Sequence, residues 1–440
     1  MSMSHTSELC DRVTEYRLVY SDSTWSRQRA DCGHNDGLLS KAKIYESSTE
    51  DGIIWTVVSP IIFSYRVIQC ERLLEANNDT LLFGHIADPV ELQALKGNGK
   101  IQKRFVVIDE TVDDLYGCQV KAYFESRGVT YKILPLPTTE ENKSMRLVIK
   151  ILEEVHKFGI DRRTEPIIAI GGGVCLDVVG LAASLYRRRT PYIRVPTTLL
   201  AYIDASVGAK TGVNFSNCKN KLGTYIPPIA SFLDKMFLRS LPRRHISNGL
   251  AEMLKMALMK HRGLFELLEK EGRGLLESNF QGLEAARVSS RLAIESMLEE
   301  LAPNLWEDQL DRLVDFGHII SPQLEMNVLP ALLHGEAVNI DMAFMVYVSH
   351  ERGFLSEEDK CRIIECMRSL DLPVWHSHCS LDLVQKSLRE RIQHSAGLQR
   401  MPLPIALGQG GIFNDTEESV VCRAFEKWNQ ELHKDNVDVL

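Results

Sequence analysis

Short runs of β-branched and aromatic residues alternate with amphipathic segments between residues 53 and 198. Runs apolar enough to predict strands lie at 53–58, 61–70, 81–84, 104–109, 129–136, 166–170 and 191–198. Segments with apolar residues at helical spacing lie at 113–128, 140–159 and 174–188. The first two strands are separated by Ser59 and Pro60, which predicts a hairpin. Strands that alternate with helices of this length predict a parallel α/β sheet.

The pattern changes after about residue 240, where no further strand is predicted. The segments 248–272 and 284–303 repeat apolar residues at helical spacing. We therefore predict a polar N-terminal extension over 1–52, an α/β domain over 53–240 and an all-helical domain over 241–440. Ligands usually bind between two such domains, beyond the carboxyl ends of the sheet strands.

Composition narrows the class of protein. The chain has 440 residues, of which 44% are hydrophobic and 25% charged, and these values are typical of globular proteins. Its formal charge of −8 argues against a general nucleic-acid or anionic-membrane binder. The ten cysteines form no CxxC pair, and no apolar run reaches a membrane span of about 18–20 residues. The N-terminal residues lack the apolar region of a secretory signal. We expect a cytoplasmic protein without nucleic-acid or membrane partners.

Two segments could bind an anionic ligand. Gly171, Gly172 and Gly173 follow a predicted strand and open a helix, so backbone amides and the helix N-terminus can approach a phosphate. The standard GxGxxG fingerprint is absent, and a tight βα turn explains the three glycines equally well. The polar, Gly-rich stretch 197–223 fits a loop around a ligand, with Lys210 and Lys219 as candidate phosphate contacts. A solvated loop is the alternative for this stretch.

A third group of residues could bind a metal ion. Glu252 lies on a predicted helix with Lys255 three residues later, and His318 and His334 follow in separate segments. One carboxylate and two imidazoles leave positions open for substrate, as in catalytic rather than structural zinc sites. Taken singly, each histidine could equally be a core residue.

Taken in order, the segments form one longer pattern. It comprises the motifs GGGVxxDxxG, YRRR, PTTLLxxIDxSVGxK, KNxLG, NGLAExxK, FGH and HGEAV. This ordered set resembles the sugar phosphate cyclase superfamily, whose best-known member is 3-dehydroquinate synthase. The resemblance extends from about Phe105 to about Gly408. It implies a dehydroquinate synthase-like fold with an NAD-binding α/β domain, a divalent metal (usually Zn²⁺, with Co²⁺ possible) and a homodimer.

The resemblance also assigns roles to individual positions. Metal binding falls to Glu252, His318 and His334. The residues that match substrate-contacting and catalytic positions of the family are Asp204, Lys210, Asn220 and Lys255. Phosphate binding falls to Lys219 and to Arg188, which in this family can reach in from the partner subunit. The positions expected around NAD are Asp109, Glu140 and Lys143 at the adenosine half, and Gly172, Gly173, Asp177, Thr197 and Thr198 at the pyrophosphate and nicotinamide.

Three departures point to a subfamily. In dehydroquinate synthase the first metal-binding histidine lies in NxGHxxGH, whereas here Asp315 replaces the asparagine and Pro322 the second histidine. Met297 stands where a lysine faces the substrate carboxylate. Because an unpaired buried carboxylate is costly, we predict a substrate without one. Asp315, His376 and the segments 186–188 and 304–307 resemble the branch that forms 2-epi-5-epi-valiolone from sedoheptulose 7-phosphate.

The predicted reaction is redox-neutral: transient oxidation by NAD, elimination of phosphate, return of the hydride and intramolecular aldol closure. We expect Asp315 and His376 to orient hydroxyl groups, although a surface position after a turn would also explain His376. Other cyclases of the superfamily remain alternatives, with 2-epi-valiolone, desmethyl-4-deoxygadusol or 3-dehydroquinate as product. A metal-dependent polyol dehydrogenase and a non-catalytic binding protein remain as further alternatives.

Overall fold

The computed structural model describes residues 16–21, 24–29, 43–49, 52–59, 61–97 and 102–435. The strands are β1 (Tyr16–Ser21), β2 (Thr24–Arg29), β3 (Lys43–Thr49), β4 (Gly52–Val58), β5 (Arg66–Cys70), β6 (Lys103–Asp109), β7 (Thr130–Leu136), β8 (Ile167–Gly171), β9 (Tyr192–Pro196), β10 (Lys210–Phe215), β11 (Cys218–Tyr225), β12 (Ala230–Asp234), β13 (Met401–Ala406) and β14 (Gln409–Phe413). The α-helices are α1 (Thr80–Phe83), α2 (Pro89–Gly97), α3 (Glu110–Ser126), α4 (Met145–Phe158), α5 (Gly173–Leu185), α6 (Arg243–Lys260), α7 (Arg262–Glu277), α8 (Glu284–Leu301), α9 (Ser321–Val328), α10 (His334–Glu351), α11 (Glu357–Ser369), α12 (Leu381–His394) and α13 (Glu418–Leu432). The shorter turns are η1 (Glu140–Asn142), η2 (Tyr186–Arg188), η3 (Ala201–Ala205), η4 (Lys235–Ser240), η5 (Ala302–Asn304), η6 (Leu313–Asp315) and η7 (His433–Asp435).

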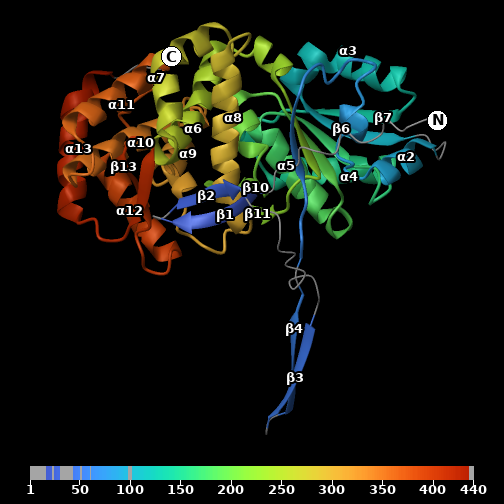
Figure 1. Cartoon of the computed structure of the whole chain (residues 1–440), viewed down its shortest axis with the longest axis horizontal. Coiled ribbons are helices and arrows are strands. Elements are labelled where there is room, and N and C mark those ends of the chain that lie inside the picture. Colours follow the sequence, from blue (N-terminus) through green and yellow to red (C-terminus); the bar gives the residue numbers. More distant parts are fainter. Residues whose placement is uncertain are drawn as a thin grey trace, which may run out of the picture.

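A parallel sheet forms the core of the N-terminal domain, with strand order β5-β12-β9-β8-β6-β7. Successive side chains of a strand point to opposite faces. Val106 and Ile108 therefore pack with α3 on one face, and Phe105 and Val107 pack with α4 and α5 on the other. Both faces are covered, which explains why these strands are continuously apolar. Figure 1 shows the sheet between its helices.

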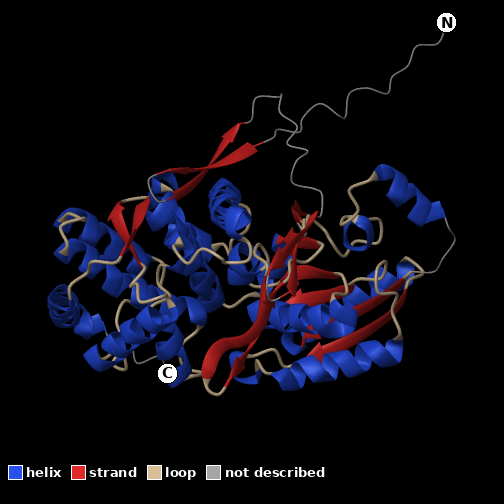
Figure 2. Cartoon of the chain, turned by 90° about the horizontal axis from the view of Figure 1, so that it is seen from below, coloured by secondary structure: helices blue, strands red, loops and turns tan. Residues whose placement is uncertain are grey.

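The C-terminal domain is built around α10. This helix is buried along nearly its whole length because α6, α9, α11 and α13 pack around it. Figure 2 shows these helices massed beside the sheet domain. The predicted fold class, a parallel α/β domain followed by a helical domain, is confirmed.

Two local predictions were wrong. Residues 81–84 were predicted as a strand, but α1 forms there, where the Asn78 side chain accepts a hydrogen bond from the Thr80 amide at 2.8 Å and both leucines of the turn are buried. The runs 53–58 and 61–70 do not pair as a hairpin. Instead, β4 pairs antiparallel with β3, and β5 joins the main sheet parallel to β12. Local apolar character does not specify the partner of a strand.

Two hairpins were not predicted. The β10–β11 hairpin contains a polar, mostly exposed strand, CKNKLGTY, which lacks the apolar pattern of a strand. The expectation that no strand follows residue 240 was also wrong, because β13 pairs with β14 inside the helical domain. The sequence of β13, MPLPIA, does not predict a strand because it contains two prolines, and proline is tolerated in strands only at edges and bulges.

The N-terminal strands form two further hairpins. β1 pairs with β2, and β2 lies against α8. β3 and β4 form a hairpin that projects from the body of the molecule, here called the arm (residues 43–49 and 52–58; Figure 1). Ile44 and Val57 are cross-strand neighbours in the arm and are 71% and 65% exposed. In the described part of the chain, no helix combines the length and apolar character that a membrane span requires.

Candidate active site

The sheet reverses its winding between β6 and β8. From β6 the chain moves outward to β7 and then returns to place β8 on the other side of β6. In open α/β sheets, ligands bind at the carboxyl ends of the strands where the order reverses. Asp109 ends β6 and Gly171 ends β8 at this point, and a Cβ on Gly171 would lie 3.4 Å from that of Asp109.

The glycine turn brings backbone close to this point. Gly172 is the N-cap of α5, and a Cβ there would lie 3.2 Å from the Thr198 methyl group. The Thr197 amide donates to the Gly171 carbonyl at 2.9 Å. The first turn of α5 carries no acidic residue, so its amides present a positive end to a ligand. The glycines and the threonine pair therefore share one edge of the sheet.

Lys143 connects the expected cofactor end to the β10–β11 hairpin. Its ammonium group donates to Asp177 on α5 and to Asn220 on β11, both at 2.7 Å. Burial alone would lower the pKa of Lys143, but Asp177 and Glu140 outweigh burial and raise it. The Glu140 carboxylate accepts from the Asn214 side chain at 2.8 Å.

Glu252, His318 and His334 converge at the base of the helical domain. Their donor atoms all lie within 4.8 Å of one another, with Glu252 Oε1 3.8 Å from His318 Nε2 and 3.5 Å from His334 Nε2. Glu252 is fully buried on α6, and His334 begins α10. Glu252 and His334 thus meet because α6 and α10 pack together, and His318 joins them from the loop before α9.

The other ring nitrogens of both histidines are already engaged. His318 Nδ1 lies 3.1 Å from the Phe316 carbonyl, and His334 Nδ1 lies 2.9 Å from Glu325 Oε2. A histidine that donates from Nδ1 keeps the Nε2 lone pair for a metal. Burial and the nearby Lys255 hold the pKa of His318 well below its ordinary range, so this imidazole stays neutral.

The donor set fits a divalent metal such as zinc. Glu252 Oε1 is buried and accepts no hydrogen bond from the described residues. In tetrahedral zinc sites with bonds of about 2.0–2.1 Å, neighbouring donor atoms lie about 3.3 Å apart, close to the separations found here. One carboxylate and two imidazoles would leave coordination positions for substrate oxygen.

Two candidate catalytic lysines lie beside this set. The Lys255 ammonium is 2.5 Å from Glu252 Oε2, and both groups are almost fully buried. Burial would lower the pKa of Lys255, but Glu252 and Asp204 outweigh this effect and raise it. Lys210 differs from Lys255. Burial of its ammonium group and the positive charge of Arg312 lower its pKa to about 8, and the negative charges of Asp315 and Asp204 offset only part of this effect. Its side chain is 56% exposed, although its ammonium group pairs with Glu307 at 2.6 Å.

Sequence reasoning missed several charged residues of the site. Glu325 is buried on α9 and contacts both Lys219 and His334. Glu307 pairs with Lys210 at 2.6 Å, and Arg312 contacts both Glu307 and Asp315. Their signal was weak, because their contacts with Lys210 and Lys219 join segments distant in sequence; Lys219 and Glu325, for example, are 106 positions apart.

Three predicted positions have surroundings other than those expected, and of these Lys219 remains beside the candidate metal ligand His334. Lys219 engages Glu325 and His334 rather than facing open space. Arg188 is exposed in η2, at the end of α5 remote from the glycine turn. His376 accepts from the His378 amide at 3.2 Å, and among the described residues no recorded contact joins it to Asp315.

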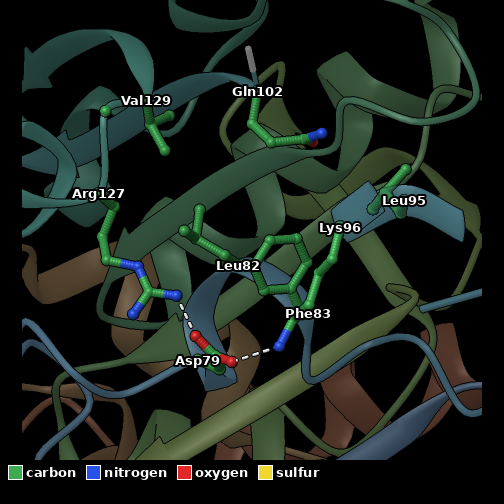
Figure 3. Close-up of a pocket in the computed structure, with 9 residues that line it drawn as sticks. Asp79, Leu82, Phe83, Leu95, Lys96, Gln102, Arg127 and Val129 are labelled. Atoms are coloured by element: carbon green, nitrogen blue, oxygen red, sulfur yellow. Dashed lines mark hydrogen bonds and ion pairs between the residues drawn. The ribbon is translucent and has the colours of Figure 1, made fainter. Parts of the chain in front are cut away.

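A separate hollow of about 370 Å³ lies at the opposite end of the sheet, where Gln102 and Val129 precede β6 and β7 (Figure 3). Its charged groups already pair with one another, since Asp79 contacts Lys96 at 2.5 Å and also contacts Arg127. None of the predicted site residues lines it.

Known proteins share this arrangement of domains. Two family models cover consecutive parts of the chain, 3-dehydroquinate synthase N-terminal at residues 133–248 and 3-dehydroquinate synthase C-terminal at residues 249–394. The chain belongs to the 3-dehydroquinate synthase family.

Within the 3-dehydroquinate synthase family, a 2-epi-5-epi-valiolone synthase from Actinomyces sp is 50% identical over 330 residues, covering 74% of this chain and 86% of that protein. A demethyl-4-deoxygadusol synthase from Trichormus variabilis is 38% identical over 325 residues, covering 72% of this chain and 79% of that protein. The structure of ValA, a 2-epi-5-epi-valiolone synthase from Streptomyces hygroscopicus subsp. jinggangensis 5008 with NAD⁺ and Zn²⁺ bound, matches with a TM-score of 0.78 and 44% identity. That match covers 86% of this chain and 100% of that one.

Proposed function

We propose that this chain is a 2-epi-5-epi-valiolone synthase that converts sedoheptulose 7-phosphate with release of phosphate. The observation that carries the proposal is the convergence of Glu252, His318 and His334, with Lys255 and Lys210 beside them. It is supported by the 50% identity to a synthase of that name. Such a reaction makes the enzyme a carbon–oxygen lyase acting on a phosphate. The cysteines in the described part of the chain are free thiols, which supports a location in the reducing cytoplasm.

The proposed roles follow from charge and position. Bound NAD⁺ and Zn²⁺ would supply transient oxidation of a carbinol and polarisation of its oxygen. Lys255 and Lys210 lie where negative charge develops on substrate oxygens, and fixed cations stabilise such charge without reorganising. Asp204 acts on both lysines through its charge. Asp315 is held by Arg312 and by Arg391 at 3.5 Å, and this rigid carboxylate could orient a substrate hydroxyl.

For the cofactor we propose the sheet edge described above. Gly172, Gly173, Thr197 and Thr198 would border the pyrophosphate and nicotinamide, with Asp109, Glu140 and Lys143 near the adenosine half. This proposal is supported by the positive end of α5 and by the reversal of strand order there.

We also propose a homodimer in which Arg188 binds the substrate phosphate of the partner subunit. The proposal is supported by the exposed arginine in η2 and by the projecting arm with its exposed Ile44–Val57 pair. An isolated two-stranded hairpin is marginal in water, so covering its apolar side chains would stabilise it.

Light scattering should give a mass of about twice the 49.8 kDa of one chain. Replacing both arm residues (Ile44→Ser and Val57→Ser) should weaken the dimer, because apolar surface would no longer be buried. Ile149→Ser, at a 51% exposed position on α4, serves as the control. A wild-type monomer at micromolar concentration would contradict the dimer.

Product analysis tests the proposed reaction. Pure protein loaded with Zn²⁺ and NAD⁺ is incubated with sedoheptulose 7-phosphate, and the product is identified by NMR while absorbance of NADH is followed. We expect 2-epi-5-epi-valiolone and phosphate with no net NADH, because each turnover oxidises and then reduces. NADH accumulating in step with product would instead indicate the polyol dehydrogenase.

A further inference from the structure

The Asp341 carboxylate binds the backbone that directly follows His318. Asp341 is fully buried on α10. Its Oδ2 atom accepts hydrogen bonds from the amides of Ile319, Ile320 and Ser321 at 2.7, 2.6 and 2.9 Å. A side chain that caps a helix usually comes from the residue just before that helix and binds one of its first amides. Here the acceptor comes from a different helix and takes three consecutive amides, which fixes this segment relative to α10.

Two further contacts hold the same segment against α10. Gly317 has a φ of +75°, and a Cβ there would lie 2.8 Å from the Val338 side chain and 3.0 Å from the Val338 carbonyl oxygen. Only glycine combines this left-handed conformation with so close an approach. The Ser321 hydroxyl donates to the Gly317 carbonyl at 2.6 Å and closes the turn around His318. The backbone on both sides of His318 is therefore fixed on α10.

One helix thus controls both imidazoles of the proposed metal site. His334 begins α10, and Asp341 lies seven residues later, about two turns along the same face. The helix carries His334 directly and holds His318 through Asp341. Replacing a buried charge by an apolar side chain of similar size is often neutral or stabilising. Overall stability therefore does not explain a carboxylate at this position, whereas control of the His318 backbone does.

We propose that Asp341 is a positioning residue that sets the direction of the His318 imidazole, and thereby the affinity and geometry of the metal site. The inference rests on the proposed metal site, since His318 is one of its ligands. Groups behind a metal ligand change affinity by about 10- to 100-fold because they hold the ligand in the productive orientation. Asp341 acts in this way through three amides of the main chain rather than through the imidazole ring.

The test measures metal binding without turnover. Full-length protein stripped of metal is titrated with Zn²⁺ in competition with a coloured chelator at about pH 8. The carboxylate is ionised at this pH, because burial raises the pKa of Asp341 only to about 6. Protein loaded with Co²⁺ gives a visible absorption spectrum that reports coordination geometry. Asp341→Ala removes the acceptor, and we expect it to weaken Zn²⁺ binding at least about tenfold and to change the Co²⁺ spectrum.

Asp341→Asn separates the hydrogen bonds from the charge. It keeps one carbonyl oxygen, and one is sufficient because Oδ2 alone receives all three amides. The other oxygen, Oδ1, accepts no hydrogen bond within the described part of the chain. We therefore expect Asp341→Asn to retain the wild-type Zn²⁺ affinity within about threefold and to keep the wild-type Co²⁺ spectrum.

Two other variants complete the comparison. Asp234→Ala is the matched control: Asp234 is also buried and accepts the amides of Leu73 and Met236 at 2.8 and 2.9 Å, but it ends β12 outside the proposed metal site. It should lower the melting temperature without changing metal affinity. Ser321→Ala removes only the hydroxyl that binds the Gly317 carbonyl and should weaken Zn²⁺ binding by about threefold or more. This smaller change decides the question if Asp341→Ala does not fold.

Unchanged Zn²⁺ affinity in Asp341→Ala, or in Ser321→Ala where the former does not fold, would overturn the inference. An equal loss in Asp341→Asn would also overturn it, because charge rather than backbone position would then be responsible. So would an equal loss in Asp234→Ala, which would indicate general destabilisation. Wild-type protein that binds no divalent metal would refute the metal site together with this inference. Wild-type protein that binds Zn²⁺ but does not convert sedoheptulose 7-phosphate would refute the proposed reaction alone.

Discussion

Replacing either histidine of the proposed metal site, by His318→Ala or His334→Ala, should lower turnover by about a thousandfold or more. A bound divalent metal stabilises developing charge by several kcal/mol, and each 1.4 kcal/mol corresponds to about a factor of ten in rate. Thermal melting should change little, because these side chains are partly exposed at the edge of a large core. His350→Ala is the matched control, since His350 lies on the same helix as His334 but contacts Leu355 and Glu357.

Glu252 requires a different comparison. Glu252→Ala would leave the buried Lys255 ammonium without its counter-charge, and breaking a buried pair costs about 3–5 kcal/mol of stability. Reversible chelation separates loss of metal from this destabilisation. Glu325→Gln supplies a graded variant: losing the carboxylate behind His334 should weaken metal binding by about 10- to 100-fold in a chelator competition. Full activity in protein shown to be metal-free by elemental analysis would contradict the assignment.

Sedoheptulose 7-phosphate should be converted at least about a thousandfold more efficiently than 3-deoxy-arabino-heptulosonate 7-phosphate. Met297 is only 2% exposed and supplies no charge for a substrate carboxylate, and leaving such a group unpaired costs several kcal/mol. The measurement is kcat/KM for each substrate under the same conditions. Comparable values for the two would refute the predicted discrimination.

Asp315 provides the second part of this prediction. Replacing Asp315 and His376 together with alanine should lower activity or change the product mixture, because hydroxyl orientation before ring closure would be lost. The single variants separate the two positions, since Asp315 is held by Arg312 and Arg391 whereas His376 contacts the His378 backbone. A wild-type product of the gadusol type, or a double variant with unchanged rate and product, would contradict the choice of subfamily.

The fold could be predicted from sequence where burial is complete. β6 and β8 are covered on both faces, so their apolar runs are continuous and easily recognised. β3, β11 and β13 lack this signal, because β3 and β11 are polar in sequence and β13 is interrupted by proline. Their pairing is set by contacts with other segments, which local patterns do not contain.

The convergence of Glu252, His318 and His334 could be predicted because a short motif surrounds each of them. Glu325 and Glu307 could not, because their contacts span 106 residues to Lys219 and 82 residues to Tyr225. The sequence marks the segment 304–307 only by its resemblance to the valiolone branch, without a role for Glu307, and nothing adjacent to Glu325 distinguishes it from the exposed carboxylates that pair along helices, such as Glu266 with Arg262. Packing of the two domains brings Lys219 to Glu325, and Lys210 and Tyr225 to Glu307.

One ammonium group, that of Lys143, holds Asp177 on α5 and Asn220 on β11 at the same distance. Lys143 therefore links two elements by hydrogen bonds. One is the helix that begins at the glycine turn, and the other is the hairpin that carries Lys210 and Lys219. Energetic coupling between two sites is reciprocal. If binding of one ligand changes the binding free energy of the other through Lys143, the second changes that of the first by the same amount. Lys143 therefore joins the proposed cofactor edge to the proposed substrate hairpin, and any change in affinity that it transmits from one ligand to the other must be matched in the opposite direction.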